Sequence, residues 1–310
     1  MNIPITQSKD WQKLQEDLGE KSYLITEKDY HFLAIEKNTP FGKYLYLPYG
    51  PVADDKQGIK DALNALTKLS EENNYIFIRI EPQLKGALEK LQYNLKKTKD
   101  LNPKETWILD LTGNEEELKS RLPSRLLRYY KSAENKGITI KSSKDPNDIK
   151  YLIILQNELA KEKGINTFSE DYLRTEAAQP FATTYLVEYN NPETNKKEII
   201  AAGLVFDDKT TRYNLQGAQS DTGRKLHATG ILTIQLIYDA KEKGQRIFDF
   251  WGIAPEGAPA DHPWAGFTNF KKTFSGREVD YTGTYDIVIN SLKYQLYTVF
   301  RKLNRFVRHV

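Results

Sequence analysis

The sequence has no cysteine among its 310 residues, one methionine and four histidines. The absence of cysteine excludes disulfide bonds, thiolate metal ligands and a cysteine nucleophile. The histidines are scattered along the chain, so a metal site built from several histidine ligands is not expected. They are His31, His227, His262 and His309. The composition therefore gives no reason to expect a metal.

Long apolar runs and a strong net charge are missing as well. No stretch reaches the roughly eighteen apolar residues of a membrane-spanning helix, and the N-terminal MNIPITQSKDWQKL lacks the apolar core of a signal peptide. We therefore expect a soluble, cytoplasmic protein. With 45 basic and 42 acidic residues the net charge is +3, which does not indicate a protein that coats nucleic acid. The length favours two domains.

The predicted elements repeat in the two halves of the chain. Each half has three strand-like runs, then a helix with apolar residues at helical spacing, then a buried strand. These runs cover residues 22–26, 31–36, 44–47, 56–72 and 75–80 in the first half, and 183–189, 198–206, 212–217, 229–243 and 246–250 in the second. Three strands, a helix and a further strand are the order of an acyltransferase-type fold, so we predict a duplicated α/β (α+β) unit.

A long loop region lies between Arg246 and Gly276. A strand leads into Trp251-Gly252, a loop rich in proline, alanine and glycine follows, and the region closes with FKKTF. Such a long loop is typical of a binding site. Lys271 lies among aromatic residues, where its ammonium could bind an anion in a partly desolvated environment. Alternatively, Lys271 is a surface lysine of a Lys-Lys pair, and its flanking phenylalanines are the apolar face of a helix. Trp251 with Gly252 can likewise be a packed turn.

The segment before the helix at 229–243 bears on coenzyme A. An acetyl-coenzyme A enzyme of this fold would have Arg/Gln-x-x-Gly-x-Gly/Ala there, with backbone amides holding the pyrophosphate. The segment reads RKLHATG from Arg224, so the arginine fits the pattern. However, His227 and Thr229 occupy the positions of the close-approach glycines. We therefore predict a donor other than coenzyme A, and no cofactor.

Two charged residues in strands are further candidates. Arg79 is expected to pair with Glu81 or to cap the next helix, and could instead hold a phosphate. Asp110 is a carboxylate in the apolar strand at 105–111, where burial would raise its pKa and suit it to proton transfer. The alternative for Asp110 is a contact with the start of the helix at Asn114.

Two helices have basic faces. Arg125, Arg128 and Lys131 follow the spacing i, i+3, i+6, with tyrosines beside them, a pattern that can bind RNA phosphates and stack bases or can simply be solvated. The last predicted helix, 291–307, mixes basic and apolar residues and could contact an anionic membrane surface or an acidic partner, or could pack back on the body. Its basic residues are Arg301, Lys302, Arg305 and, just beyond, Arg308.

Several separate stretches together resemble one family. They are QS at 7–8 with Trp11, LPYGPV at 47–52, IRIEP at 78–82, LDL at 109–111, YYKSAENKG at 129–137, GAQS at 217–220 with Arg224, FDFWGI at 248–253, FKKTF at 270–274 and GTYD at 283–286. In this order they resemble the Fem family of aminoacyl-tRNA-dependent peptidyltransferases, which add amino acids to peptidoglycan precursors.

The resemblance implies an architecture and a function. It implies two tandem acetyltransferase-like (GNAT-like) subdomains without a coiled-coil arm. We assign residues 1–143 with the C-terminal helix at 290–310 to the precursor side, and residues 144–289 to the aminoacyl-donor side. It further implies a cytoplasmic bacterial aminoacyltransferase that takes an amino acid from a charged tRNA. The acceptor would be the stem-peptide amino group of UDP-MurNAc-pentapeptide or lipid II.

The resemblance also places Phe270 and Lys271 in the donor site, near the developing charge. The chain departs from the family pattern in having Tyr49 for arginine, Trp251 for glycine and Lys131 for arginine. The predicted sites are catalytic Lys271, Phe270 and Asp110; substrate-binding Arg79, Arg224, Trp251 and Tyr49; and tRNA-binding Arg125, Arg128 and Lys131. The alternatives are an N-acyltransferase of the same fold with another donor, and a non-catalytic module that binds RNA or the precursor.

Overall fold

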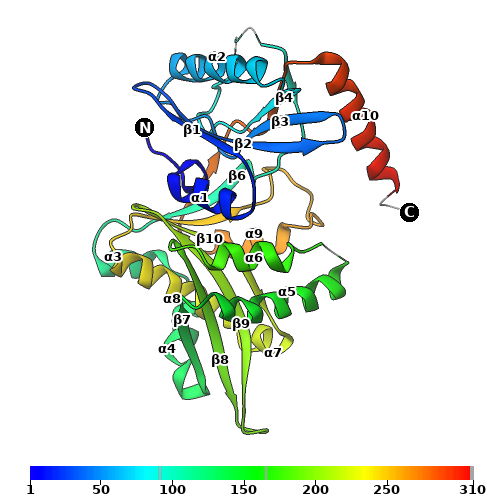
Figure 1. Cartoon of the computed structure of the whole chain (residues 1–310). Coiled ribbons are helices and arrows are strands. Elements are labelled where there is room, and N and C mark those ends of the chain that lie inside the picture. Colours follow the sequence, from blue (N-terminus) through cyan, green and yellow to red (C-terminus); the bar gives the residue numbers. More distant parts are fainter. Residues whose placement is uncertain (90, 92, 165, 308–310) are drawn as a thin grey trace. The chain divides into compact units, whose positions relative to one another are not determined.

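The computed structural model describes residues 1–89, 91, 93–164 and 166–307, apart from the side chains of residues 163 and 304–307. The chain divides into two compact units (Figure 1). Unit 1 comprises Met1–Lys104 and Asp280–Val310, and unit 2 comprises Glu105–Val279. The predicted boundaries, 143/144 and 289/290, are wrong. Residues 105–143 belong to the second unit because their strands pair within its sheet.

Unit 1 contains a six-stranded sheet in the order β1-β2-β3-β4-β13-β5. Its elements are η1 (Ile5–Gln7), α1 (Lys9–Asp17), β1 (Ser22–Thr26), β2 (His31–Thr39), β3 (Gly42–Leu47), α2 (Lys56–Glu72), β4 (Phe77–Ile80), β5 (Leu95–Lys97), β13 (Tyr285–Val288) and α10 (Ser291–Val307). The strands β1, β2 and β3 form an antiparallel meander, and β4 then runs parallel to β3. Helix α2 makes this crossover, and its apolar stripe is buried in the core of the unit.

Unit 2 contains a seven-stranded sheet in the order β12-β6-β11-β10-β9-β8-β7. Its strands are β6 (Glu105–Asp110), β7 (Ile138–Ser143), β8 (Ala182–Asn191), β9 (Lys196–Asp207), β10 (Thr211–Gln219), β11 (Ile247–Gly252) and β12 (Arg277–Asp280). Its helices are α3 (Glu115–Arg121), α4 (Ser124–Lys131), η2 (Glu134–Lys136), η3 (Pro146–Asp148), α5 (Ile149–Lys163), α6 (Glu170–Ala177), α7 (Asp221–Lys225), α8 (Ala228–Glu242) and α9 (Ala265–Lys272).

The predicted duplication is confirmed. In unit 1 the meander β1-β2-β3 is followed by α2 and the parallel strand β4, and in unit 2 the meander β8-β9-β10 is followed by α8 and the parallel strand β11. Helix α8 is buried on most of its surface, since it packs between the sheet and α4. Each unit therefore has the mixed α/β architecture that the order of elements predicts.

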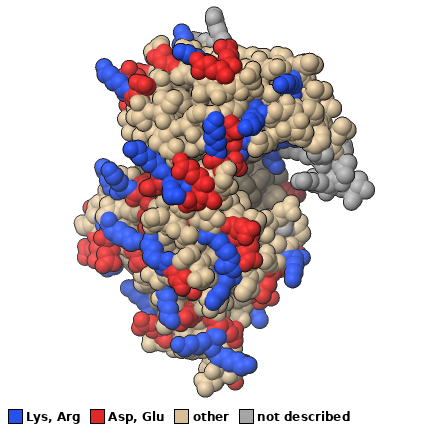
Figure 2. All heavy atoms as spheres, viewed as in Figure 1, with Lys and Arg blue, Asp and Glu red and all other residues tan. Residues whose placement is uncertain are grey.

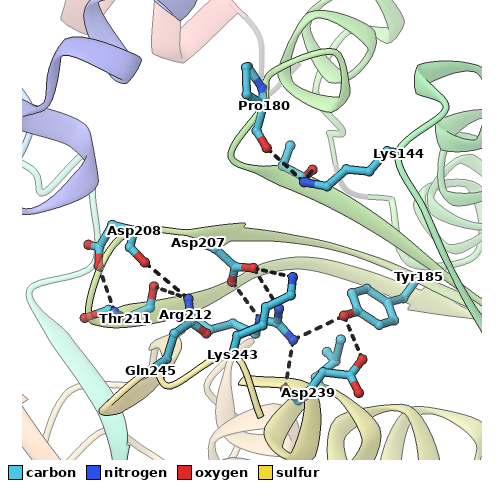
Figure 3. A network of polar contacts seen from close by, with 12 residues as sticks. Lys144, Pro180, Tyr185, Asp207, Asp208, Thr211, Arg212, Asp239, Lys243 and Gln245 are labelled. Atoms are coloured by element: carbon cyan, nitrogen blue, oxygen red, sulfur yellow. Dashed lines mark hydrogen bonds and ion pairs between the residues drawn. The ribbon is translucent and has the colours of Figure 1, made fainter. Parts of the chain in front are cut away.

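A buried polar network holds the start of β10 (Figure 3). The fully buried guanidinium of Arg212 donates two hydrogen bonds of 2.7 Å to the carboxylate of Asp207, at the end of β9. It also donates to the backbone oxygen of Leu236 on α8 and to the hydroxyl of Tyr185 on β8. The Gln245 side-chain amide donates to the backbone oxygen of Thr211. Strands β8, β9 and β10 and helix α8 are thus tied together where β10 begins.

The C-terminal segment returns to unit 1, as predicted. Strand β13 pairs antiparallel with β4, placing Asp286 opposite Arg79. Both side chains are buried, and the carboxylate of Asp286 accepts two hydrogen bonds from the guanidinium, of 2.7 and 2.8 Å. The hydroxyl of Tyr294, on α10, also donates to Asp286. The predicted pairing of Arg79 with Glu81 is therefore wrong, because β13 supplies the carboxylate.

Helix α10 contacts unit 1 through aromatic rings. The ring of Phe77 lies 5.3 Å from that of Tyr294 and 5.0 Å from that of Tyr297, measured between centroids. No helix among the described residues is long and apolar enough to cross a membrane.

We predict that Asp286→Ala lowers the free energy of unfolding by about 3–5 kcal/mol, because it leaves the buried Arg79 guanidinium without its counter-charge. Denaturant unfolding measures this loss. The matched control is Glu89→Ala, which removes the carboxylate of the exposed Lys56–Glu89 ion pair and should cost at most about 1 kcal/mol. A loss for Asp286→Ala as small as that of the control would contradict the prediction.

Candidate functional site

The candidate site lies where two central strands of unit 2 separate. Strands β10 and β11 pair in parallel only between Thr211–Tyr213 and Ile247–Asp249, although β10 continues to Gln219 and β11 to Gly252. Each strand also changes register against its other neighbour at this point. Beyond Tyr213 and Asp249 the backbone groups on the facing edges have no ladder partners in each other. Such an opening at strand ends is a common place for ligand sites.

Trp251 occupies the irregular end of β11. Its φ of 66° lies in the left-handed region, which a bulky residue adopts at a cost of about 1–2 kcal/mol. Its N–H donates a 2.7 Å hydrogen bond to Oδ1 of Asp249, and its ring contacts that of Tyr213 edge to face. Glycine adopts this conformation without steric cost. In this chain a tryptophan ring takes that position beside the opening.

Lys271 reaches the same strand end from the last turn of α9. Its Nζ donates a 2.6 Å hydrogen bond to the backbone oxygen of Gly252 and lies 4.9 Å from the ring centroid of Phe267. The side chain is half-buried, and burial lowers the pKa of Lys271 to about 8. Lys271 is therefore a partly desolvated cation held at the opening between the strands, as its aromatic surroundings in the sequence predict.

Asp249 is a site residue that sequence analysis did not single out. Its carboxylate is buried and accepts hydrogen bonds from the Thr106 hydroxyl and the Trp251 N–H. Burial raises the pKa of Asp249 to about 6, while these hydrogen bonds and the charge of Lys271 act in the opposite direction. The signal in the sequence that could have identified Asp249 is an aspartate between two phenylalanines in a strand that is otherwise apolar.

The aromatic residues around Lys271 divide between core and surface. Phe274 is fully buried, and Phe270 packs edge to face against it at 5.5 Å. Phe267 is 40% exposed. The loop after β11 is fixed to α9 because the Ala254 N–H donates to the Thr268 hydroxyl. Phe270 therefore anchors α9 in the core, and Phe267 forms the exposed side of the lysine's surroundings.

Asp110 does not belong to this site. It pairs with Ile247 at the beginning of β11, about 16 Å along the strand from Gly252 at a rise of about 3.3 Å per residue. It is exposed, and its Oδ1 accepts hydrogen bonds from the hydroxyl and N–H of Thr112. These hydrogen bonds hold the pKa of Asp110 below its usual value. The predicted rise in pKa is wrong because the strand ends before the side chain is covered.

The segment before α8 does not fit coenzyme A. Residues Asp221–Lys225 form the short helix α7, and His227 precedes α8 with a φ of 59°. The Thr229 N–H, in the first turn of α8, donates to the side-chain oxygen of Gln219. A backbone amide that would hold a pyrophosphate is thus already satisfied by the chain. Arg224 is half-exposed and forms ion pairs with Asp221 and Glu162.

The three basic residues of α4 are exposed, but they do not act as one group. Arg125 donates a hydrogen bond to the Tyr129 hydroxyl. Arg128 and Lys131 line a pocket of about 550 Å³ together with Ser124, Leu127, Ser132 and Asn135. The ring of Tyr129 stacks on that of His227 at 4.2 Å. On the face seen in Figure 2, basic and acidic residues are mixed, without an extended surface of one sign.

Two predicted site residues lie in unit 1. Arg79 is buried in its ion pair with Asp286. Tyr49 is buried, has a φ of 53° and donates a hydrogen bond to the backbone oxygen of Pro103. Both are bonded within the unit itself. Among the described residues, no group of His, Asp and Glu could hold a metal ion.

Comparison with known proteins gives one family match. Residues 182–302 match the family model of the FemAB family, a segment that includes β11, Asp249 and Lys271. This part of the chain is similar to the FemAB family. No curated protein sequence matches it.

Solved structures share its fold. The structure of FemX aligns over 94% of each chain with a TM-score of 0.79 at 17% identity. L-PGS from Bacillus licheniformis aligns over 93% of this chain and 94% of its own, with a TM-score of 0.58 at 16% identity. A tandem GNAT protein from the clavulanic acid biosynthesis pathway aligns over 86% and 82%, with a TM-score of 0.51 at 10% identity. The fold is thus a pair of GNAT-like subdomains, as predicted.

We predict that Asp249→Asn lowers the pKa of Lys271 below about 8, because the carboxylate's charge is the interaction that opposes desolvation of the ammonium. Asparagine retains an oxygen to accept from Thr106 and Trp251. An NMR titration of isotopically dimethylated lysines measures the change. Asp110→Asn is the matched control, at the other end of β11, and should leave the value unchanged. An unaltered or raised pKa in Asp249→Asn would refute this coupling.

Proposed function

We propose that this protein transfers an amino acid from a charged tRNA to the stem-peptide amino group of a peptidoglycan precursor, UDP-MurNAc-pentapeptide or lipid II, in the bacterial cytoplasm. The observation that carries the proposal is the desolvated ammonium of Lys271 at the opening between β10 and β11. The family model covers the strand and helix that build this site. The similarity to FemX supports the same fold.

The reaction needs positioning and charge stabilisation more than a strong base. The aminoacyl ester of the tRNA is already activated, and the neutral acceptor amine attacks its carbonyl carbon. The carbonyl oxygen becomes an oxyanion, the C–N bond forms, and the C–O bond to the ribose breaks. The ribose hydroxyl leaves with a proton from the attacking amine, so the products are an amide and a free tRNA end. A fixed cation beside the oxyanion lowers this barrier.

Lys271 is suited to be that cation. With a pKa of about 8 its ammonium is roughly nine-tenths protonated at pH 7. Partial burial strengthens its interaction with a developing negative charge, because little water screens it. Asp249 acts as a positioning residue, since its charge opposes loss of the lysine's proton and its oxygen fixes the backbone of Trp251. Trp251 then forms a wall of the donor site.

The proposal assigns the precursor to unit 1 and the aminoacyl donor to unit 2. Exposed Arg125, Arg128 and Lys131 are the candidates for tRNA phosphates, and Arg224 is a further exposed cation of the same unit. Asp110 has no part in the proposed mechanism, because its carboxylate is fully ionised and lies at the other end of β11. Buried Arg79 and Tyr49 support the fold of unit 1 and are not proposed as substrate ligands.

The direct test incubates the protein with labelled glycine, alanine or serine, tRNA, the matching synthetases and UDP-MurNAc-pentapeptide or lipid II. Ribonuclease-sensitive transfer of label to the precursor is expected. If label never enters either precursor, the proposed function fails. Transfer that occurs from a small thioester without tRNA would instead support an N-acyltransferase of the same fold.

We predict that Lys271→Ala lowers turnover by about 100-fold or more, as expected when a group that stabilises an oxyanion is lost. Lys272→Ala is the matched control, because the adjacent Lys272 is exposed and pairs with Glu278. Single-turnover rates of both variants should be compared after their thermal unfolding has been shown to match the parent. Equal rates in the two variants would remove Lys271 from the reaction.

A further inference from the structure

The outward face of α10 is apolar. Five large apolar side chains of this helix are exposed: Leu292 by 69%, Leu296 by 47%, Val299 by 56%, Phe300 by 37% and Leu303 by 58%. Four of them follow the spacing i, i+4, i+7, i+11, which puts them in one stripe along the helix. We call these five residues the α10 stripe. Monomeric soluble proteins rarely expose a contiguous apolar surface without using it.

The opposite face of α10 is the one that packs on unit 1. Tyr294 and Tyr297 contact the ring of Phe77, and Arg301 donates a hydrogen bond to the hydroxyl of Thr98. Together with the bond from Tyr294 to Asp286, these contacts fix the rotation of the helix about its axis. Phe300, at the edge of the α10 stripe, also contacts the ring of Phe41 edge to face at 5.6 Å. The other four residues of the stripe are directed away from the core of unit 1. In Figure 1 the helix is the red element beside the sheet of this unit.

Charge indicates the kind of partner. The helix has basic residues and no acidic residue, so two copies of it would bring like charges together without opposite charges to pair them. Lys293 and Lys302 are exposed and border the stripe on its two sides. The predicted Arg305 and Arg308 lie outside the side chains that the structure describes. An apolar stripe with basic flanks is the pattern of helices that lie in the interface of an anionic bilayer.

We propose that α10 docks the protein on an anionic lipid bilayer, with the α10 stripe inserted among the acyl chains and Lys293 and Lys302 at the headgroups. The helix lies along the surface and does not span it. If the chain is the aminoacyltransferase proposed above, on which this consequence rests, docking favours the lipid-linked acceptor over the soluble one. It would concentrate the enzyme on the surface that carries lipid II.

The test measures flotation of the full chain with vesicles of phosphatidylglycerol and phosphatidylcholine, without any substrate. Binding is expected to the mixed vesicles and to be much weaker with phosphatidylcholine alone. Leu296→Glu should weaken partitioning by about tenfold or more, because a charge replaces an inserted apolar side chain. Ile154→Glu is the matched control, an equally exposed aliphatic residue on α5 of unit 2, and should bind as the parent does.

Several results would overturn the docking proposal. One is parent protein that does not float with anionic vesicles, and another is equal binding by Leu296→Glu and Ile154→Glu. A dimer in sedimentation that Leu296→Glu converts to a monomer, without vesicle binding, would assign the stripe to self-association. Transfer to soluble UDP-MurNAc-pentapeptide is measured separately, so failure of docking leaves the proposed chemistry intact. Conversely, docking without any transfer would refute only the proposed function.

Discussion

The site of this protein depends on one backbone constraint, the separation of two parallel strands in the middle of a sheet. Strands β10 and β11 pair over three residues each and then diverge. The polar network around Arg212 holds the start of β10, so the separation has a fixed origin (Figure 3). Past it, Gly252 stays in register with Thr106 of β6, and its backbone oxygen accepts a hydrogen bond from Lys271. The cation is thus bonded to the backbone of β11 beyond the point where β10 and β11 separate.

The two units have the same architecture but differ in how far their parallel strands pair. This difference explains why the chemistry is assigned to unit 2. In unit 1 the equivalent parallel strands, β3 and β4, pair to their ends at Leu47 and Ile80. The charged residue of β4, Arg79, is neutralised by Asp286 across the next strand pair. In unit 2 the charged residue of β11 is Asp249. It has no arginine opposite it on β6, the strand with which β11 pairs there. The same architecture occurs twice, and in unit 2 the charges of Asp249 and Lys271 influence each other beside the opening between β10 and β11.

The sequence predicts the parts of this structure that depend on local pattern. Apolar spacing predicts α2 with the bounds that the structure has, and the order of elements predicts the duplication. The aromatic surroundings of Lys271 and the FKKTF motif indicate its role as a partly buried cation. Interactions between distant segments cannot be predicted from local pattern. Arg79 and Asp286 are 207 residues apart, and the charge of Asp249 acts on Lys271 because the lysine on α9 reaches the end of β11. The prediction that Asp110 is buried is wrong because the apolar residues of a strand do not show where along the strand burial ends.

The balance of two opposing effects on Lys271 favours a lysine over an arginine at this position. Burial acts against the ammonium, and the charge of Asp249 acts for it, with burial the larger effect. An arginine would keep its charge under the same burial, but its planar guanidinium would need more than one acceptor. The single Gly252 oxygen satisfies one donor of the ammonium and leaves the others for a substrate. A compact cation with spare donors and weakened solvation interacts more strongly with an oxyanion than with a neutral ester. That difference in binding between transition state and substrate is what catalysis requires.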